Sequence, residues 1–308
     1  MTSASSLMSP RGALPPELVD QVIDELGEAY HRPVQLYRRG ACAALRACSL
    51  VSRRWNARSR VHLFKRIEID GDEDEPIATP PTSILPHVKE LVLNLYGGNP
   101  EPIPIRYLLN AFITAPIYFL GIVGASLDDK RACIRERIDV HSATLRKVEF
   151  KDCYLSTHNI ADIALGSHRL TTLRLVGCAH ERPPSPGQQS LITDDKTLSP
   201  RSKPSGVELR ISLGDNLEDF VSITAMAARL PHHFSKLDVD HIADKEKAVE
   251  ATNALIKANG DLLSLLRIRI NAGTTETSSL DELLITVQSQ GKWTLTSSRG
   301  LFSVSRSA

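Results

Sequence analysis

Two stretches in the middle of the chain repeat one spacing of apolar residues, and this repeat constrains the fold more than any other feature. Apolar residues occupy the first, fourth and sixth positions of each stretch, and a cysteine follows three positions later. The positions are Leu145, Val148, Phe150 and Cys153, followed by Leu155, and then Leu170, Leu173, Leu175 and Cys178. Because residues two apart on a strand share a face, each stretch predicts a short strand with one buried face.

Further copies of the spacing occur on both sides of these two stretches. They are Phe64, Ile67, Ile69; Val88, Leu91, Leu93; Ile117, Leu120, Ile122, Ala125, Leu127; Leu209, Ile211; Phe234, Leu237, Val239; and Leu265, Ile268, Ile270. Successive copies start about 24 to 31 residues apart, with one longer step, which is close to the period of a repeat protein. Helices are predicted between strands at 105–113, 157–165, 220–230 and 245–258, and a last short strand at 292–295.

The spacing resembles that of leucine-rich repeats. This resemblance implies an α/β fold in which residues 67–308 form a solenoid with a curved parallel sheet, where each repeat is stabilised by its neighbours. A cysteine at the ninth position of the template fills the turn beneath the strand. The longer step contains residues 181–206, which are rich in Pro, Ser, Gly and Gln and predict a flexible insertion.

The first seventy residues carry a helical pattern instead. Five apolar residues recur at three- and four-residue spacing and predict one amphipathic helix: Leu18, Val19, Val22, Ile23 and Leu26. Pro15 and Pro16 suit its beginning, where a missing N–H costs nothing. A second helix is predicted from Ala41 to Val61, with its own stripe of Leu45, Cys48, Val51 or Ser52, and Trp55.

The segments LPPELVDQVIDEL, SLVSRRW and the following LF together resemble an F-box, so residues 13–66 are interpreted as a helical F-box-like domain behind a disordered N-terminus at 1–12. The resemblance implies binding to the Skp-type adaptor of a cullin-RING ubiquitin ligase, and through it to a cullin. The residues implied in adaptor binding are Leu14, Pro15, Leu18, Val22, Ile23, Leu26, Leu50, Val51 and Trp55. The stretch GEAYHRPVQLYRRGACA between the predicted helices is longer than a compact F-box needs.

Basic residues are concentrated in the same region. Ten Arg and Lys residues lie between His31 and Ile67 without a single Asp or Glu, although the formal net charge of the chain is only +1. Such a block can steer an acidic partner, and the adaptor bound by F-box proteins is acidic. Nucleic acid is the rival partner, but no stacking aromatics or recognition-helix pattern accompany the arginines, so no nucleic-acid function is predicted.

By the same resemblance, the repeats would hold a protein target. Strand residues that alternate with the apolar positions point away from the core and are the candidate target-binding residues. The set comprises Glu149, Lys151, Arg174, Arg210, Asp238, Arg267 and Arg269. Their charges are mixed, which leaves the charge of the target open. A repeat-built scaffold outside any ligase, with a helical N-terminal cap, is the alternative interpretation.

Catalysis is not predicted. The five cysteines include no C-x-x-C pair, and the chain has no phosphate-binding loop or nucleophile motif, so no cofactor, metal or active site is expected. The uncharged run 107–127 is long enough to span a membrane, but Pro116 and the repeat spacing favour a buried repeat. The N-terminus lacks the apolar core of a signal peptide, which predicts a cytoplasmic or nuclear protein. Ser185 and Ser199 each precede a proline and are candidate phosphorylation sites.

Overall fold

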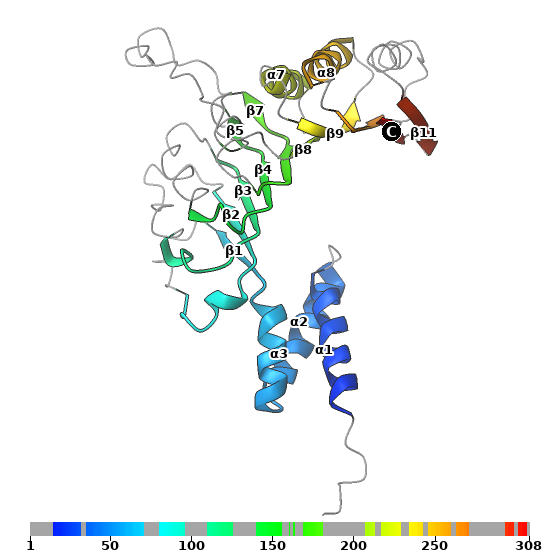
Figure 1. The fold of residues 1–308 in the computed structure, drawn as a ribbon. Helices are drawn as coiled ribbons and strands as arrows, with labels where there is room; N and C mark the ends of the chain where they lie inside the picture. The colour runs from blue at the N-terminus through cyan, green and yellow to red at the C-terminus, as the bar shows by residue number, and fades with distance from the viewer. Residues whose placement is uncertain are drawn as a thin grey trace, which may run out of the picture. The chain divides into compact units, whose positions relative to one another are not determined.

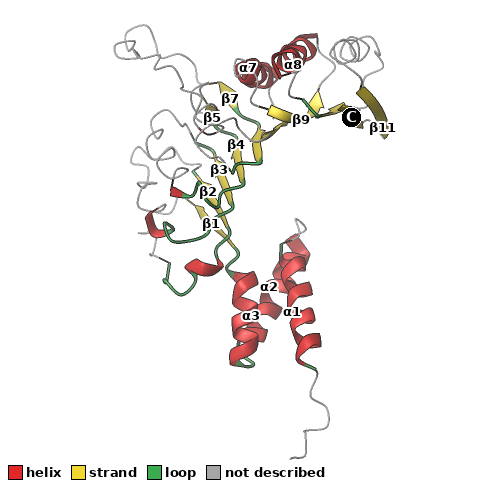
Figure 2. Cartoon of the chain, in the orientation of Figure 1, coloured by secondary structure: helices red, strands yellow, loops and turns green. Residues whose placement is uncertain are grey.

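A computed structural model describes residues 15–31, 35–70, 80–95, 110–125, 140–155, 160, 163, 169–180, 207–212, 217–228, 234–242, 246–259, 263–270, 293–298 and 301–306. The chain divides into two compact units (Figure 1). The first comprises Met1–Ile67 with Pro81–Val88, and the second comprises Glu68–Pro80 with Lys89–Ala308. The secondary structure is mixed α/β, with helices in the first unit and a mostly parallel sheet in the second (Figure 2).

Three helices build the first unit: α1 (Pro16–Tyr30), α2 (Gln35–Ser49) and α3 (Arg53–Leu63). The predicted single helix from Ala41 to Val61 is therefore wrong, because the chain breaks at Leu50–Ser52. Ser52 has an extended backbone, and its hydroxyl accepts a hydrogen bond from the Trp55 N–H at 3.3 Å, which caps α3. The stretch that looked too long between two helices is mostly α2, so that only residues 31–34 connect α1 to α2.

The core of the first unit is small. Val19, Ile23 and Leu45 are buried, and five partly buried side chains pack against them: Leu26, Tyr30, Cys48, Trp55 and Leu63. Gly27 lies where the ring of His62 approaches α1, so closely that a Cβ atom at Gly27 would stand 2.1 Å from Nδ1 of that ring. The absence of a side chain at Gly27 therefore lets α1 and α3 pack together.

The second unit is organised by one ten-stranded sheet in the order β1-β2-β3-β4-β6-β8-β9-β10-β12-β11. Its strands are β1 (Arg66–Asp70), β2 (Glu90–Asn94), β3 (Phe119–Val123), β4 (Lys147–Lys151), β6 (Thr172–Val176), β8 (Val207–Ser212), β9 (Phe234–Ile242), β10 (Leu265–Ile270), β11 (Trp293–Ser298) and β12 (Leu301–Arg306). From β2 to β10 each strand pairs parallel with the next. A two-stranded parallel sheet of β5 (Tyr154–Leu155) and β7 (Ala179–His180) accompanies it.

The end of the sheet differs from the rest. A last strand was predicted at 292–295, and the structure places two strands there instead: β11 pairs with β12, and β12 pairs with β10, both antiparallel. The sequence pattern predicts no strand at 301–306, where the structure has β12. Antiparallel strands need only a short connection, and two positions separate the end of β11 from the start of β12.

Two rows of apolar side chains run across the parallel strands in register. The first is Leu91, Leu120, Val148, Leu173, Leu209, Leu237 and Leu266, and the second is Leu93, Ile122, Phe150, Leu175, Ile211, Val239 and Ile268. All fourteen side chains are buried. The predicted frame of the last repeat, which began at Leu265, is off by two residues, because Leu263, Leu266 and Ile268 take the buried places.

Helices α7 (Leu217–Ala228) and α8 (Glu246–Asn259) pack against each other beside strands β8 and β9 (Figure 2). They contribute buried side chains to the core, namely Phe220, Ile223, Ala227, Ala251, Leu255 and Ile256. The helices predicted at 220–230 and 245–258 correspond to these two. Those predicted at 105–113 and 157–165 lie mostly outside the described residues. None of the described helices has the length and apolar character that crossing a bilayer requires.

One turn geometry recurs at the ends of three neighbouring strands. Gly124, Asp152 and Gly177 directly follow β3, β4 and β6, and each has a positive φ, of 69°, 52° and 57° respectively. The residue after each turn is buried: Ala125, Cys153 and Cys178. The Cys153 thiol donates to the Ile122 carbonyl at 3.4 Å, and the Cys178 thiol donates to the Phe150 carbonyl at 3.3 Å, one strand back in each case. The two cysteines are therefore structural residues: each lies just after a turn, and its thiol bonds to the neighbouring strand.

Candidate functional site

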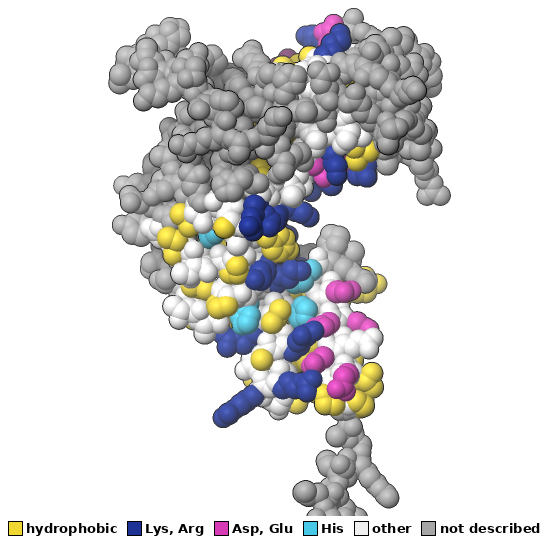
Figure 3. All heavy atoms as spheres, in the orientation of Figure 1, with side chains coloured by type: hydrophobic (Ala, Val, Ile, Leu, Met, Phe, Trp, Pro, Cys, Tyr) yellow, Lys and Arg dark blue, Asp and Glu magenta, His cyan; other side chains and the backbone are white. Residues whose placement is uncertain are grey.

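The first unit exposes apolar side chains that its core does not use. Leu18 and Val22 on α1 are 48% and 51% exposed, while Leu50 and Val51 in the α2–α3 turn are 87% and 61% exposed. We call these four residues the apolar patch. Asp20 of α1 contacts Arg54 in the first turn of α3, so the start of α1 and the α2–α3 turn lie at the same end of the unit. Figure 3 shows apolar side chains gathered where α1 begins.

The other residues implied in adaptor binding take different places. Pro15 is exposed at the N-cap of α1. Ile23 is buried in the core, while Leu26 and Trp55 are partly buried against it, so these three stabilise the unit. Leu14 lies outside the described residues. The amphipathic stripe predicted along α1 therefore divides into a buried half, with Val19 and Ile23, and an exposed half that belongs to the apolar patch.

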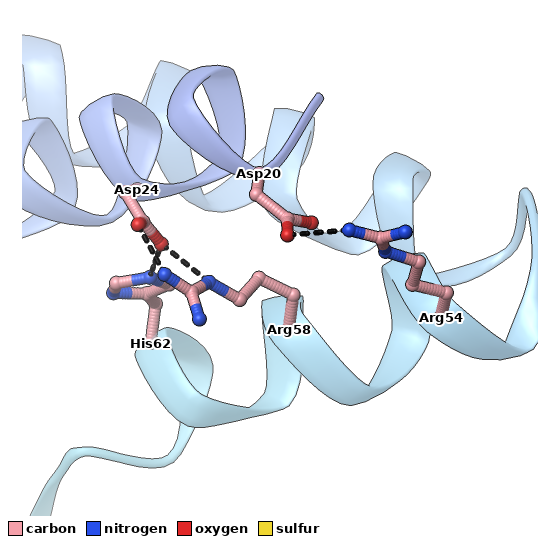
Figure 4. A network of polar contacts seen from close by, with 5 residues as sticks. All are labelled: Asp20, Asp24, Arg54, Arg58 and His62. Atoms are coloured by element: carbon pink, nitrogen blue, oxygen red, sulfur yellow. Dashed lines mark hydrogen bonds and ion pairs between the residues drawn. The ribbon is translucent and has the colours of Figure 1, made fainter. Parts of the chain in front are cut away.

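A ladder of ion pairs joins α1 to α3 (Figure 4). Arg54 donates to Asp20 at 2.7 Å, and Arg58 donates to both carboxylate oxygens of Asp24, with 2.7 Å between Nε and Oδ1. Nε2 of His62 lies 2.9 Å from the same Oδ1. The two acids are four residues apart on α1, and the three basic residues are spaced by four on α3. Residues four apart lie on the same side of a helix, one turn apart, so the facing sides of α1 and α3 carry these charges at the same spacing.

This ladder changes the local electrostatics. The hydrogen bond from Arg58 is the main cause that lowers the pKa of Asp24 to about 2, and Asp20 in turn raises the pKa of Arg54. Two arginines of the basic block are thus neutralised within the unit. Arg39, Arg46 and Arg53 are exposed and have no ion-pair partner within the described part of the chain, so the field available to a partner is smaller than the linear count of arginines predicted.

Sequence reasoning missed the ladder although a signal for it exists. Acids at i and i+4 in the first predicted helix match basic residues at i, i+4 and i+8 in SRRWNARSRVH. Such matched spacing predicts contacts only once the two helices are known to be neighbours running in the same direction. The unrecognised break between α2 and α3 concealed that neighbour relationship.

The second unit places most of the predicted target-binding residues on one face of the sheet. Glu149, Arg174, Arg210, Asp238 and Arg267 are register partners across β4, β6, β8, β9 and β10, so they form one row. Lys151 lies two residues further along β4 and is exposed. The backbone of Arg269 lies in β10 opposite Leu301, and its side chain is outside the described part of the structure. We call the face that carries this row the outward face.

The outward face changes in character along the sheet. At β2 and β3 the row continues with Val92 and Gly121, which are apolar and buried, because Phe119 and Val92 surround the position above Gly121. From β4 onward its members are charged. The sheet therefore offers a polar surface over β4–β10 and a closed apolar surface over β2–β3. Figure 3 shows Lys and Arg side chains among those exposed on the second unit.

The cysteines do not form a reactive site in the part of the chain that is described. Burial raises the pKa of the Cys153 thiol to about 11 and that of Cys178 to about 12, which keeps both as neutral thiols at physiological pH. Cys42 and Cys48 are free and half-buried in the first unit. Among the described residues, no group of three His, Cys, Asp or Glu side chains is arranged to hold a metal ion.

Neither a protein-family model nor a curated protein sequence matches the chain significantly. The fold alone defines the class of this protein: a mixed α/β chain with a three-helix unit followed by a mostly parallel sheet.

Proposed function

We propose that this chain is a substrate-receptor subunit of a cullin-RING ubiquitin ligase, in which the three-helix unit acts as an F-box and binds a Skp-type adaptor. The observation that carries the proposal is the apolar patch. Leu50 and Val51 stand in solvent on a turn held by the Ser52 cap, next to a core that is already complete without them. Large exposed apolar side chains that cluster on a small unit are typical of a protein-binding surface.

These four side chains lose their contact with water when a partner covers them. Complete burial of one Val or Leu side chain contributes about 1.5–3 kcal/mol, so four exposed side chains supply enough for a few of them to act as binding hot spots. The exposed Arg46 and Arg53 flank the apolar patch in sequence and suit an acidic adaptor. The unit would thus combine an apolar anchor with a basic rim.

We further propose that the second unit is a divergent leucine-rich-repeat domain that holds the target. Three observations support this: the two in-register apolar rows, the recurring left-handed turn after β3, β4 and β6, and the two cysteines whose thiols bond one strand back. Recurrence of one local geometry at one register position is what stacked repeats produce. The chain would then present a protein to catalytic subunits and perform no chemistry itself.

Co-purification with a Skp-type adaptor tests the proposal. The full-length chain is expected to retain the adaptor, and Leu18→Asp plus Leu50→Asp is expected to abolish retention, because a buried unpaired carboxylate is costly in an apolar interface. Val61→Asp provides the matched control, since Val61 is 43% exposed and lies near the other end of α3. Trp55 is unsuitable for this test because it packs on the core.

Two results would refute the ligase proposal. One is failure of the wild-type chain to bind the adaptor, and the other is equal binding by the Leu18→Asp plus Leu50→Asp variant. Either result would favour the alternative of a repeat-built scaffold whose helices serve as a cap. Circular dichroism of each variant establishes that the helices are intact before binding is compared.

A further inference from the structure

On the outward face, the described carboxylates have partners within the chain, whereas three lysines have no ion-pair partner among the described residues. On strands β2–β9, every carboxylate of this face whose side chain is described is already engaged: Glu149 with Arg174 at 3.2 Å, Glu208 with Arg210 at 3.0 Å, Asp238 with Arg210 at 3.9 Å, and Glu90 with the hydroxyl of Tyr118. The negative charges described on these strands are therefore already committed to contacts inside the chain.

The lysines of the same face are in the opposite situation. Lys147 and Lys151 at the two ends of β4, and Lys236 on β9, are all exposed. None of the three has an ion-pair partner among the residues that the structure describes. Arg267 adds a further cation on β10, in the row that contains Asp238. Among the side chains that the structure describes on β4–β10, the charge left for a ligand is thus positive, although the sequence shows acidic and basic residues in mixture.

We propose that the outward face over β4–β10 binds an acidic, extended peptide segment of a protein target. This inference rests on the proposed function only in taking this face as the target-binding surface; it adds the chemistry of the target. Glu149, Glu208 and Asp238 keep Arg174 and Arg210 in fixed positions, and the lysines around them attract the ligand. Ordered arginines and free lysines together favour carboxylate binding with little loss of side-chain freedom.

The geometry of the sheet sets the spacing of acidic residues in that segment. Lys147 and Lys151 are four residues apart on one strand, which separates their Cα atoms by about 13 Å. Lys147 and Lys236 are paired through β6 and β8, three strands apart, which is about 14 Å at the usual distance between strands. Either separation corresponds to about four residues of an extended peptide. We infer that the target carries acidic side chains at roughly this interval.

Nucleic acid fits this face less well. A phosphate backbone carries a charge at every nucleotide, and it would have to pass over the carboxylates of Glu149 and Glu208, which lie between the lysines, and of Asp238, which lies beside Lys236. A peptide can place neutral residues over these carboxylates and its acids over the lysines. Preference for a nucleic acid would therefore contradict the proposal.

Fluorescence anisotropy with the full-length chain tests the proposal without any adaptor. The probe is a labelled 12-residue peptide with Glu at every fourth position and neutral polar residues between, compared with the same peptide carrying Gln and with a 12-nucleotide single strand of DNA. The Glu peptide is expected to bind with a dissociation constant below about 1 mM at low salt, and binding should weaken as salt is raised.

Charge reversal locates the binding site. Lys147→Glu plus Lys151→Glu is expected to weaken binding of the Glu peptide by about tenfold or more. Lys247→Glu plus Lys257→Glu is the matched control, because it makes the same change in net charge on the exposed side of α8, in the same unit. This control is expected to retain most of the affinity.

Three results would overturn the proposal: no binding of the Glu peptide, equal loss in both double variants, or tighter binding of the DNA strand. Adaptor co-purification of Lys147→Glu plus Lys151→Glu keeps the two proposals separable. Normal adaptor binding with lost peptide binding supports the acidic-target inference. A wild-type chain that binds the Glu peptide but not the adaptor would refute the ligase function and leave the peptide site standing.

Discussion

Arg58 on α3 holds both carboxylate oxygens of Asp24 on α1, with 2.7 Å between its Nε and Oδ1, although the two residues are 34 positions apart in the sequence. The same carboxylate also meets His62. Asp24 thereby joins the first helix to the last helix of the three-helix unit. Several consequences of this contact and of the turn geometry after the strands can be measured.

Asp24→Asn is expected to destabilise the three-helix unit by about 0.5–1 kcal/mol at pH 7, a value that allows for solvent screening because the Asp24 side chain is 38% exposed. The folded-state pKa of about 2 lies below the ordinary 3.8, so the contribution is present above pH 3.8 and is lost as the pH falls towards 2. Urea titrations at pH 7 and pH 2, monitored by Trp55 fluorescence in a Trp293→Phe background, measure both effects.

Glu25→Gln serves as the control for that measurement. Glu25 is exposed on the same helix, and its side chain accepts only from Gln21 at 3.2 Å among the contacts described. Its loss is expected to change stability little. If Asp24→Asn and wild type unfold at the same urea concentration at pH 7, the contact between Asp24 and Arg58 has no energetic role.

Gly27→Ala is expected to destabilise the unit by about 1–3 kcal/mol, because the added Cβ would stand 2.1 Å from the His62 ring and displace it from Asp24. Gly40→Ala in α2 is the matched control. Nothing lies within 4 Å of the position of its Cβ, so alanine there is expected to stabilise the helix by about 0.5–1 kcal/mol. Thermal unfolding followed by circular dichroism distinguishes the two.

A double variant then identifies the cause. When His62→Ala is combined with Gly27→Ala, the space for the new methyl group is available, and the combined loss is expected to be smaller than the sum of the single losses. Additive losses would show that Gly27 matters for a reason other than its approach to His62.

Gly177→Ala is expected to destabilise the second unit by about 1–2 kcal/mol, because Gly177 has a φ of 57° and the left-handed conformation is strained for alanine. Gly177→Asp is expected to cost less, since Asp152 adopts this conformation at the corresponding position after β4. Guanidinium unfolding of both variants gives the comparison. Equal losses would argue that crowding, rather than backbone conformation, selects glycine there.

Thiol reactivity is expected to separate the cysteines of the two units. Cys153 and Cys178 are buried with raised pKa values, so a disulfide reagent at pH 8 should modify them only when the protein opens, about a hundredfold more slowly than the half-buried Cys42 and Cys48. A Cys133→Ser background and mass spectrometry of the labelled peptides assign each rate. Similar rates for all four thiols would contradict the buried position of Cys153 and Cys178.

Much of the parallel sheet could be predicted from the sequence because burial and strand periodicity are local. Leu145, Val148 and Phe150 alternate with polar residues at the spacing of one strand, and their counterparts around Leu173 repeat it. The pattern fails where local signals are ambiguous. Leu263, Leu265 and Leu266 are all apolar, so only the pairing of β10 with β9 decides which of them is buried.

The candidate site was less accessible to sequence reasoning because it depends on which helices are neighbours. Apolar periodicity groups Leu18 with Val19 and Ile23, yet a small core has room for only part of the stripe. The remainder, with Leu50 and Val51 from a break that the Ser52 cap creates, becomes the apolar patch. Sequence alone therefore indicated the right region of the chain but not which of its residues are exposed.

By itself the sequence determined the spacing of most strands, the buried rows of the sheet as far as β9 and the helical nature of the first unit, since these follow from the order of apolar and polar residues along the chain. Only the tertiary structure decided how charges are used. Arg54 and Arg58 look like free cations in sequence but are neutralised by α1, whereas Lys147, Lys151 and Lys236 remain exposed beside engaged carboxylates. The reason is that ion pairing depends on distances across elements, which the linear order does not encode.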